Sequence, residues 1–182
     1  MAALDLVLGF VNSHDGAAVD PTRVDRFADG ARYRDWLASR GLPAEASDAD
    51  AAAARELRES LIDVVRTHNA DVEPARLAEA EERLRRSALR HPLTPVITAA
   101  GVLLQPAQPG VFGEVLAGVV ELSLSGKWAR LKTCRAHPCR WVFVDQTRNG
   151  SALYCSPGCA SKAAMRAYRE RKKAASSGPT TP

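Results

Sequence analysis

The four cysteines of this 182-residue chain all lie within one stretch of 26 residues, and this clustering constrains the fold more than any other feature. Cys134 and Cys139 form one close pair, and Cys155 and Cys159 form a second pair after fifteen intervening residues. Two such pairs are typical of a tetrahedral zinc site, because each pair brings two sulfurs to one ion at about 2.3 Å. Four thiolates close the shell around the metal, so we predict a structural Zn²⁺. Iron is the alternative, since four-thiolate sites also bind it.

Disulfides between these cysteines are not expected, because structural disulfides need an oxidising compartment. Residues 1–7 include Asp5 and carry no positively charged side chain ahead of the apolar ones, which argues against a secretory signal. No stretch approaches the roughly 18 to 20 apolar residues that a membrane span needs. We therefore predict a cytoplasmic protein without a membrane partner.

Charge divides the chain into two parts. Residues 1–126 contain 13 Arg and 19 acidic residues, a net charge of −6, whereas residues 127–182 contain 12 Lys and Arg against two acidic residues, a net charge of +10. A basic segment joined to an acidic body suggests that the segment binds a polyanion while the body has another task. The predicted domains are therefore an acidic, mostly helical domain over 1–126, a zinc finger over 127–173 and a disordered tail over 174–182.

Apolar periodicity predicts that the acidic domain is mainly helical. Residues 93–105 are rich in Val, Ile, Leu and Thr and are broken at Ala100-Gly101, which favours a short β-hairpin. Residues 4–11 fit either a strand or a helix. The expected helices run from Asp20-Pro21 to residue 37 through Val24, Phe27, Ala28 and Ala31, over residues 48–68, over residues 73–90 with Asp71 as a cap, and through Phe112, Val115, Leu116, Val119 and Val120.

The cysteine-rich segment has a pattern of its own. Residues 140–145 alternate like a strand, with Trp141 and Phe143 on one side, and Asn149-Gly150 predicts a turn. Residues 151–155 are expected to return as the second strand. Ser156-Pro157 then begins a helix that is expected to reach about residue 173. A knuckle, a hairpin and a helix carrying the last ligand describe a small α+β, treble-clef-like finger, for which the metal supplies much of the folding free energy.

The final helix is predicted to carry a stripe of positive charge. With 3.6 residues per turn, four cations share one face, and because like charges repel, their grouping favours an anionic partner such as phosphate backbone. Arg140 and Arg148 are expected to extend this basic patch. A solvated surface helix is the alternative. The four residues of the stripe are Lys162, Arg166, Arg169 and Lys173.

Three functions remain open for such a finger. DNA binding is favoured, RNA binding would use Trp141 or Tyr154 to stack on unpaired bases, and a protein-interaction module would dock on an acidic partner. An enzyme is not expected, because no nucleophile–base pair, carboxylate pair or phosphate loop emerges. The acidic domain suits a small-molecule effector or a protein partner, and one finger is a small footprint, so a homodimer is a further expectation. His137 is interpreted as a loop residue, and residues 12–15 as capping groups.

The sequence resembles the bacterial CGNR zinc-finger proteins with an N-terminal ABATE domain, over nearly the whole chain. Two departures are visible: Cys159-Ala160-Ser161-Lys162 stands where the family has its name-giving Cys-Gly-Asn-Arg, and the second cysteine pair is one residue tighter than usual. The resemblance implies a nucleoid-associated, stress-induced transcription regulator whose finger binds DNA. It rests on residues 8–13, residues 130–134, the Asp145-Gln-Thr-Arg148-Asn149 turn, Ala167-Tyr168-Arg169 and the four cysteines.

Overall fold

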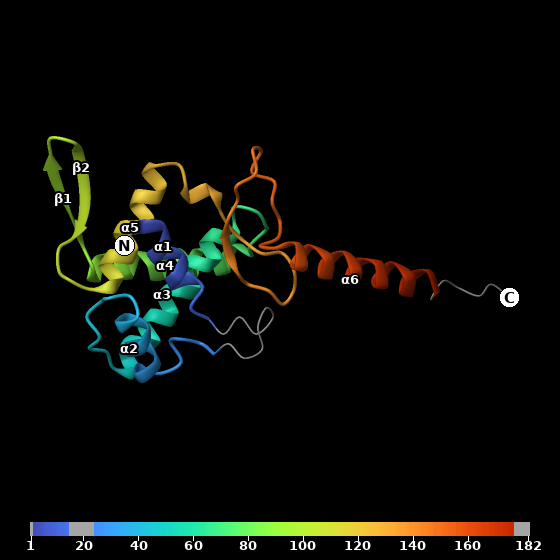
Figure 1. Cartoon of the computed structure of the whole chain (residues 1–182), viewed down its shortest axis with the longest axis horizontal. Helices are drawn as coiled ribbons and strands as arrows, with labels where there is room; N and C mark the ends of the chain where they lie inside the picture. The colour runs from blue at the N-terminus through green and yellow to red at the C-terminus, as the bar shows by residue number, and fades with distance from the viewer. Residues whose placement is uncertain (1, 15–23, 177–182) are drawn as a thin grey trace.

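The computed structural model describes residues 2–14 and 24–176 (Figure 1). Its elements follow one another as five helices interrupted by a β-ribbon, then a short hairpin, then a last helix. They are α1 (Ala3–Val11), α2 (Gly30–Ala38), α3 (Asp48–Arg66), α4 (Pro74–Arg90), β1 (Leu93–Thr98), β2 (Gly101–Pro106), α5 (Val111–Leu124), the 3₁₀ turn η1 (Trp128–Arg130), β3 (Leu131–Thr133), β4 (Val142–Val144) and α6 (Pro157–Ser176).

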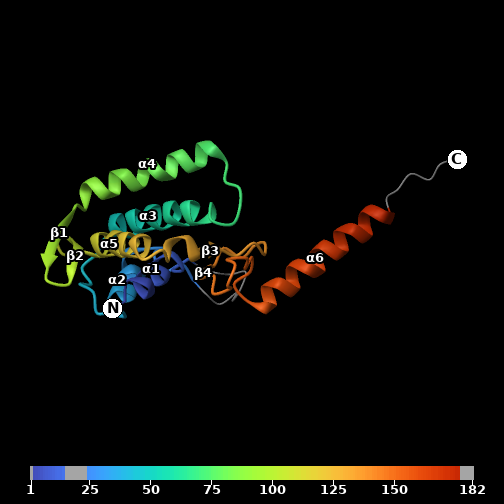
Figure 2. The same ribbon diagram turned by 90° about the horizontal axis from the view of Figure 1, so that it is seen from above.

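Helix α3 organises the N-terminal body. It packs against α4 on its outer side and against α1 and α2 on the other (Figure 2). Between these helices lies an aromatic core in which the Phe27 ring is fully buried, with ring centroids 5.1 Å from Phe10, 4.9 Å from Tyr33 and 5.1 Å from Trp36. Edge-to-face packing of this kind stabilises a core beyond the burial of its area. Residues 4–11, which the sequence left between strand and helix, belong to α1, which packs against α5 and α3.

The long helices agree with the sequence, with small differences at their caps. Ser47 caps α3 through a reciprocal capping box with Asp50. Helix α4 begins at Pro74 and is capped by the Glu73 side chain, so the expectation of Asp71 as its cap was wrong. A carboxylate directly before a first-turn proline can reach the free amides of that turn.

The first predicted helix is shorter than its apolar spacing suggested. Asp20 and Pro21 lie outside the described residues, but α2 begins only at Gly30, so the expectation of a helix through Val24 and Phe27 was wrong. The Asp29 side chain caps the helix by accepting from the Arg32 amide at 2.8 Å. Phe27 contributes to the apolar spacing because its ring is buried in the core, although the residue lies before the helix.

Residues 93–106 form the predicted ribbon. β1 and β2 pair antiparallel from Leu93 opposite Pro106 to Thr98 opposite Gly101, and Figure 1 shows the ribbon projecting from the body. At the other end of the molecule α6 extends away from the body along its longest axis (Figures 1 and 2). Within the described parts of the chain, no helix combines the length and the apolar character that crossing a membrane requires.

The second hairpin differs from the prediction. β4 pairs antiparallel with β3, Leu131 opposite Val144, so that residues 134–141 form the connection between the two strands. Residues 151–155, expected as the partner of β4, are not a strand. The predicted turn is present, with Gly150 at a φ of +61°. The knuckle therefore lies inside the hairpin rather than before it.

Candidate metal centre

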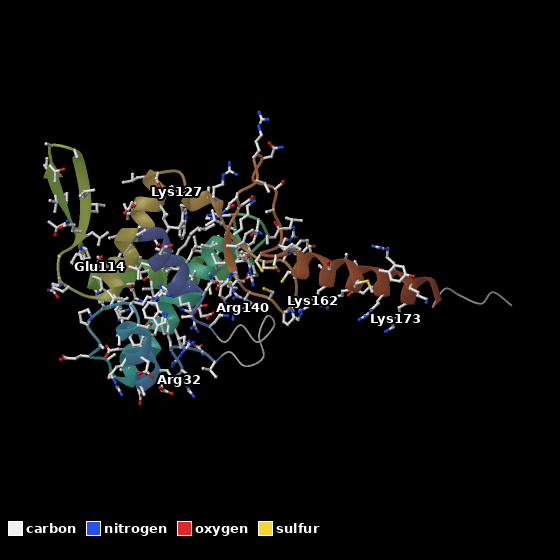
Figure 3. All side chains as sticks on the ribbon, in the orientation of Figure 1. Arg32, Glu114, Lys127, Arg140, Lys162 and Lys173 are labelled. Atoms are coloured by element: carbon white, nitrogen blue, oxygen red, sulfur yellow. The ribbon has the colours of Figure 1, made fainter. Side chains whose placement is uncertain are left out.

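The four cysteines converge at the base of α6. Cys134 and Cys139 lie in the β3–β4 connection, Cys155 precedes α6, and Cys159 is in its first turn. Their four Sγ atoms lie within 4.8 Å of one another, with Cys139 and Cys155 3.9 Å apart and Cys155 and Cys159 3.6 Å apart. A tetrahedral ion with 2.3 Å bonds to sulfur separates its ligands by about 3.8 Å. The cluster therefore fits one four-coordinate metal ion, and Figure 3 shows the sulfur atoms gathered there.

Backbone amides and a hydroxyl hold these thiols in place. The Cys134 amide donates to the Trp141 carbonyl at 2.8 Å, which closes the knuckle. The Cys155 amide donates to the Cys134 sulfur at 3.4 Å. The Ser156 hydroxyl accepts from the Cys159 amide at 3.2 Å, so that it caps the first turn of α6. The sequence Ser-Pro before the last ligand thus positions that ligand.

The surroundings of the thiols shift their pKa values in different directions. Burial raises the pKa of Cys139 to about 11 and also raises the pKa of Cys155. Burial acts in the same direction on Cys159, but hydrogen bonds led by the one with Ser156 outweigh it, so the pKa of Cys159 is lowered. A metal ion would replace the protons of these thiols, which is the ordinary chemistry of thiolate sites.

His137 does not join the cluster. Its side chain is exposed in the knuckle, and its Nδ1 accepts from the Arg166 guanidinium at 3.2 Å. The interpretation of His137 as a loop residue rather than a ligand is consistent with this contact. The histidine links the knuckle to α6 instead.

A buried carboxylate organises the loop between β4 and the second cysteine pair. Asp145, only 2% exposed, forms an ion pair with the Lys132 ammonium at 2.6 Å. It accepts from the Thr147 amide at 2.9 Å and from the Ala152 amide at 3.0 Å. Burial acts to raise the pKa of Asp145, but Lys132 and Thr147 hold it well below its ordinary value. Sequence reasoning gave Asp145 no role, although an Asp two residues before a Thr is typical of such a turn.

Side chains of the N-terminal body hold the hairpin that carries the knuckle. The Asn12 amide is paired twice with the Val142 backbone, donating to its carbonyl and accepting from its amide, both at 2.8 Å. His68 Nδ1 donates to the Leu131 carbonyl at 2.8 Å. Both Leu131 and Val142 belong to the core of the body. Asn12 is the C-cap residue of α1, as a capping role requires, but its side chain serves the hairpin.

The predicted basic residues separate into two groups. The stripe on α6, namely Lys162, Arg166, Arg169 and Lys173, is exposed along its whole length, and Figure 3 shows Lys162 and Lys173 at opposite ends of the helix. Arg166 is partly engaged by Glu170, at 3.0 Å.

The two arginines outside α6 differ from each other. Arg140 forms an ion pair with Glu59 of α3, so its charge is paired with the body rather than added to the stripe (Figure 3). Arg148 is exposed in the turn after β4.

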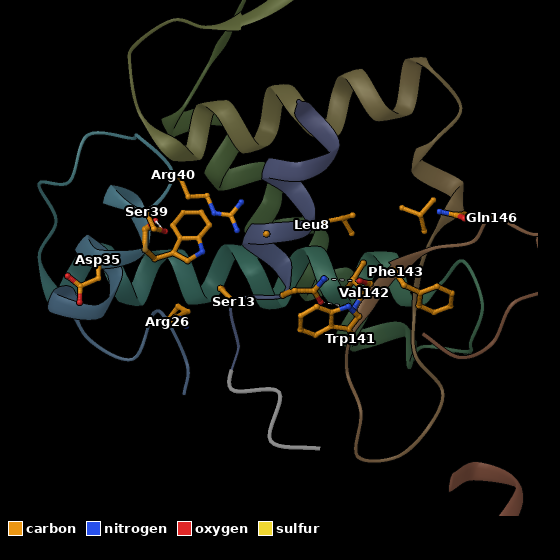
Figure 4. A pocket seen from close by; sticks show the side chains of 14 residues that line it. Leu8, Ser13, Arg26, Asp35, Ser39, Arg40, Trp141, Val142, Phe143 and Gln146 are labelled. Atoms are coloured by element: carbon orange, nitrogen blue, oxygen red, sulfur yellow. Dashed lines mark hydrogen bonds between the residues drawn. The ribbon is translucent and has the colours of Figure 1, made fainter. Parts of the chain in front are cut away.

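A groove of about 720 Å³ lies between the body and β4 (Figure 4). Trp36, Arg40 and Gly9 form its wall on the body, and the Arg40 guanidinium lies 5.0 Å from the Trp36 ring. A Cβ atom on residue 9 would come within 2.3 Å of that guanidinium, so a larger residue there would displace the end of the Arg40 side chain. Trp141 and Val142 contribute the wall on β4. Cavities of this size are typical of small-molecule sites.

Family comparisons divide the chain at the same place as its charge. Residues 4–126 match the ABATE family model, described as "Putative stress-induced transcription regulator". Residues 130–172 match the CGNR zinc finger model. The comparison with curated proteins found no match. The second match spans the knuckle, the hairpin strand β4, all four cysteines and the basic stripe of α6 up to residue 172.

Proposed function

The chain belongs to the ABATE family and carries a CGNR zinc finger, and on this premise we propose that it is a transcription regulator that binds DNA through the exposed face of α6. The observation that carries the proposal is the position of the cysteine cluster. It sits at the first turn of a 20-residue helix whose exposed side chains include four aligned cations. One anchored end and one exposed basic face suit an element that contacts a polyanion.

The proposed metal is Zn²⁺, held by Cys134, Cys139, Cys155 and Cys159. When bound, it would supply structural cross-linking rather than catalysis, because four thiolates leave no position for a reacting water. Isolated helices are marginal in water, so Cys159 acts by tying the start of α6 to the knuckle. No catalytic residue is included in this proposal.

The cations of α6 are proposed to contact different parts of the DNA. Lys162 and Lys173, at the two ends of the stripe, suit phosphate contacts, which fix the position of a protein on the duplex. Arg166 and Arg169 lie between them and suit either phosphate or the acceptor edge of guanine. DNA is favoured over RNA because Trp141 and Tyr154, the candidates for base stacking, pack against the cysteine cluster. Binding to DNA would place the protein at the bacterial nucleoid.

The proposal predicts that Arg166→Ala combined with Arg169→Ala weakens binding to duplex DNA and makes it less dependent on salt. Each phosphate contact that is lost lowers the slope of log affinity against log salt by about one. Fluorescence anisotropy over a range of salt concentrations measures both quantities. The target sequence is first found by selection from random duplexes with the zinc-loaded protein, and metal content is measured on the same samples.

A matched control is available on the body. Arg85→Ala combined with Arg86→Ala removes the same charge from two exposed positions of α4 and should leave the slope unchanged. If the α6 variant binds DNA with the same affinity and the same salt dependence as the unsubstituted protein, then α6 is not the element that contacts DNA. Preference for single-stranded RNA in direct competition would favour the RNA-binding alternative. Capture of an acidic protein that survives nuclease treatment would favour a protein-interaction module.

The groove between the body and β4 is the proposed effector site. Arg26 and Arg40 give its lining two positive charges against the one negative charge of Asp35, so we propose a small anionic molecule. A ligand there touches β4, the strand that begins three residues after Cys139. Binding can therefore bias the position of the finger relative to the body.

A thermal-shift screen of small metabolites tests the effector site. A true ligand stabilises the unsubstituted protein and changes its affinity for DNA, and its own affinity changes by the same factor when DNA is present. Gln146→Trp, which fills the groove from an exposed position, should abolish the shift. Gln108→Trp, exposed beyond the groove, is the control. A ligand that still stabilises Gln146→Trp binds elsewhere.

A further inference from the structure

The β1–β2 ribbon is an exposed apolar surface without charge. Residues 91–113 contain no Asp, Glu, Lys or Arg. In the antiparallel register Ile97 lies opposite Val102 and Pro95 opposite Leu104, so these four side chains share one face. Ile97 is 82% exposed and Val102 61% exposed. A two-stranded ribbon of this kind is marginal in water unless something packs on it.

A groove lies beside the ribbon, lined by residues from both faces of β2 and by α5. Its volume is about 780 Å³, and its aliphatic lining includes Leu103 from β2 and Val120 and Leu124 from α5. Leu124 is 79% exposed. Among the described residues, the only charged side chains at the groove are Glu114 and Glu121. These two carboxylates disfavour an occupant with negative charge, and the leucines of the lining suit an aliphatic one.

We propose that the ribbon and this groove form the interface between two copies of the chain. The ribbon is an uncharged aliphatic projection, and the groove beside it is lined by aliphatic residues and two glutamates. The ribbon of one copy can therefore occupy the groove of the other. A two-fold axis makes such a pair self-complementary and closes the assembly at two copies. The acidic bodies, which repel one another, then meet where charge is absent.

The size of the surface is adequate for a stable pair. Six residues per strand make a ribbon roughly 20 Å long, and in a two-fold pair each copy buries its ribbon in the partner and its groove around the partner's ribbon. A standard interface buries roughly 800 Å² per partner, and the side chains offered for burial here include Ile97, Val102, Leu103 and Leu124, each more than half exposed. Pro95 lacks an amide hydrogen and so disfavours edge-to-edge extension along β1, which leaves the face and the groove as the contact.

The inference does not depend on DNA binding. The ribbon and α6 lie at opposite ends of the molecule (Figures 1 and 2), so pairing through the ribbon leaves the basic stripe accessible. A variant that loses the pairing should keep its zinc and the salt-dependent contact of a single finger with DNA. The two proposals can therefore fail separately.

Sedimentation velocity of the full zinc-loaded chain across the micromolar range tests the interface. We expect a species of twice the 19.6 kDa chain mass. Ile97→Asp combined with Val102→Asp should raise the dissociation constant of the dimer on the order of a hundredfold. Leu124→Asp in the groove should have the same effect. These side chains are exposed, so circular dichroism should be unchanged.

Leu153→Asp is the matched control, because this leucine is 39% exposed in the finger rather than at the ribbon, and the pairing should persist. A chain that remains monomeric throughout the concentration range would overturn the inference. So would a dimer that survives both the ribbon and the groove substitutions, because the copies would then meet elsewhere.

Discussion

At the scale of single residues, the body contains a buried charge that is stabilised by an ion pair. The Arg58 side chain is only 3% exposed, yet its guanidinium makes two bonds of 2.7 Å to the Asp25 carboxylate and lies 5.3 Å from the Phe27 ring. A buried charge of this kind is tolerated only when its partner is present. The Asp145–Lys132 pair in the finger follows the same principle, and it fixes the loop that leads to Cys155.

Asp25→Asn is predicted to lower the free energy of unfolding by about 2 kcal/mol at pH 7. Removing one partner of a buried pair typically costs about 3–5 kcal/mol, but Glu59 also contacts Arg58, at 3.2 Å, and reduces the loss. Urea denaturation measures the difference. Asp29→Asn is the control: its pair with Arg32 is exposed and Asn caps a helix as well as Asp does, so about 0.5 kcal/mol or less is expected.

The same pair predicts a dependence on pH. Burial acts to raise the pKa of Asp25, but its hydrogen bonds from Arg58 and Phe27 lower it below the ordinary 3.8. The stabilisation is therefore complete above about pH 5 and is lost as the pH falls through 3.8 towards the lowered pKa. The difference between the unsubstituted protein and Asp25→Asn should shrink over that interval. A difference that stays constant down to pH 3 would contradict the assignment.

At the scale of elements, the β4 strand shows where a pattern is informative and where it is silent. The alternation of residues 140–145 correctly predicts that Trp141 and Val142 face opposite sides, and the structure shows Val142 in the main core and Trp141 against the cysteine cluster. Alternation does not name the partner strand. The real partner, β3, has only three residues with Lys132 in the middle, which is too short for a periodic signal. Burial of Leu131 and the bonds from Asn12 and His68 select it.

At the scale of the whole molecule, the finger is joined to the body and not suspended from it. Helix α3 packs on β3, α1 contacts β4, and Glu59 pairs with Arg140. The second half of the finger, from the turn at Gly150 to α6, is joined to the first half by the bond between Asp145 and the Ala152 amide and by the cysteine cluster. This arrangement divides the stability of the finger between the core and the metal.

Removal of zinc is predicted to release α6 while leaving the body folded. Chelation should reduce the helical signal by the contribution of the 20-residue α6, because a helix of that length without packing is marginal. Hydrogen exchange should accelerate in α6 and remain slow in α3. Cys159→Ser should reproduce the effect without a chelator, whereas Ser161→Ala, exposed on the same helix, should not. Equal loss of protection in α3 would show that the metal supports the entire fold.

Much of this protein is determined by local sequence. The spacing of the cysteines predicts their convergence, and the apolar periodicity predicts α3, α4 and α5. The Ser156-Pro157 pair predicts the start of α6, and segments rich in Val, Ile, Leu and Thr around Ala100-Gly101 predict the ribbon. These features depend on residues that are a few positions apart in the sequence. Backbone geometry determines how such residues lie relative to one another in a helix, strand or turn. The division of charge at residue 126 likewise needs no structure.

Tertiary structure alone decided the remainder, because long-range contacts have no local signature. Asn12 reaches Val142 across 130 positions, Glu59 pairs with Arg140, and Asp145 is buried against Lys132. These contacts choose the partner of β4 and remove Arg140 from the basic stripe. These contacts form only when distant segments pack together around the core. That packing depends on the whole chain, so it cannot be predicted from any one segment.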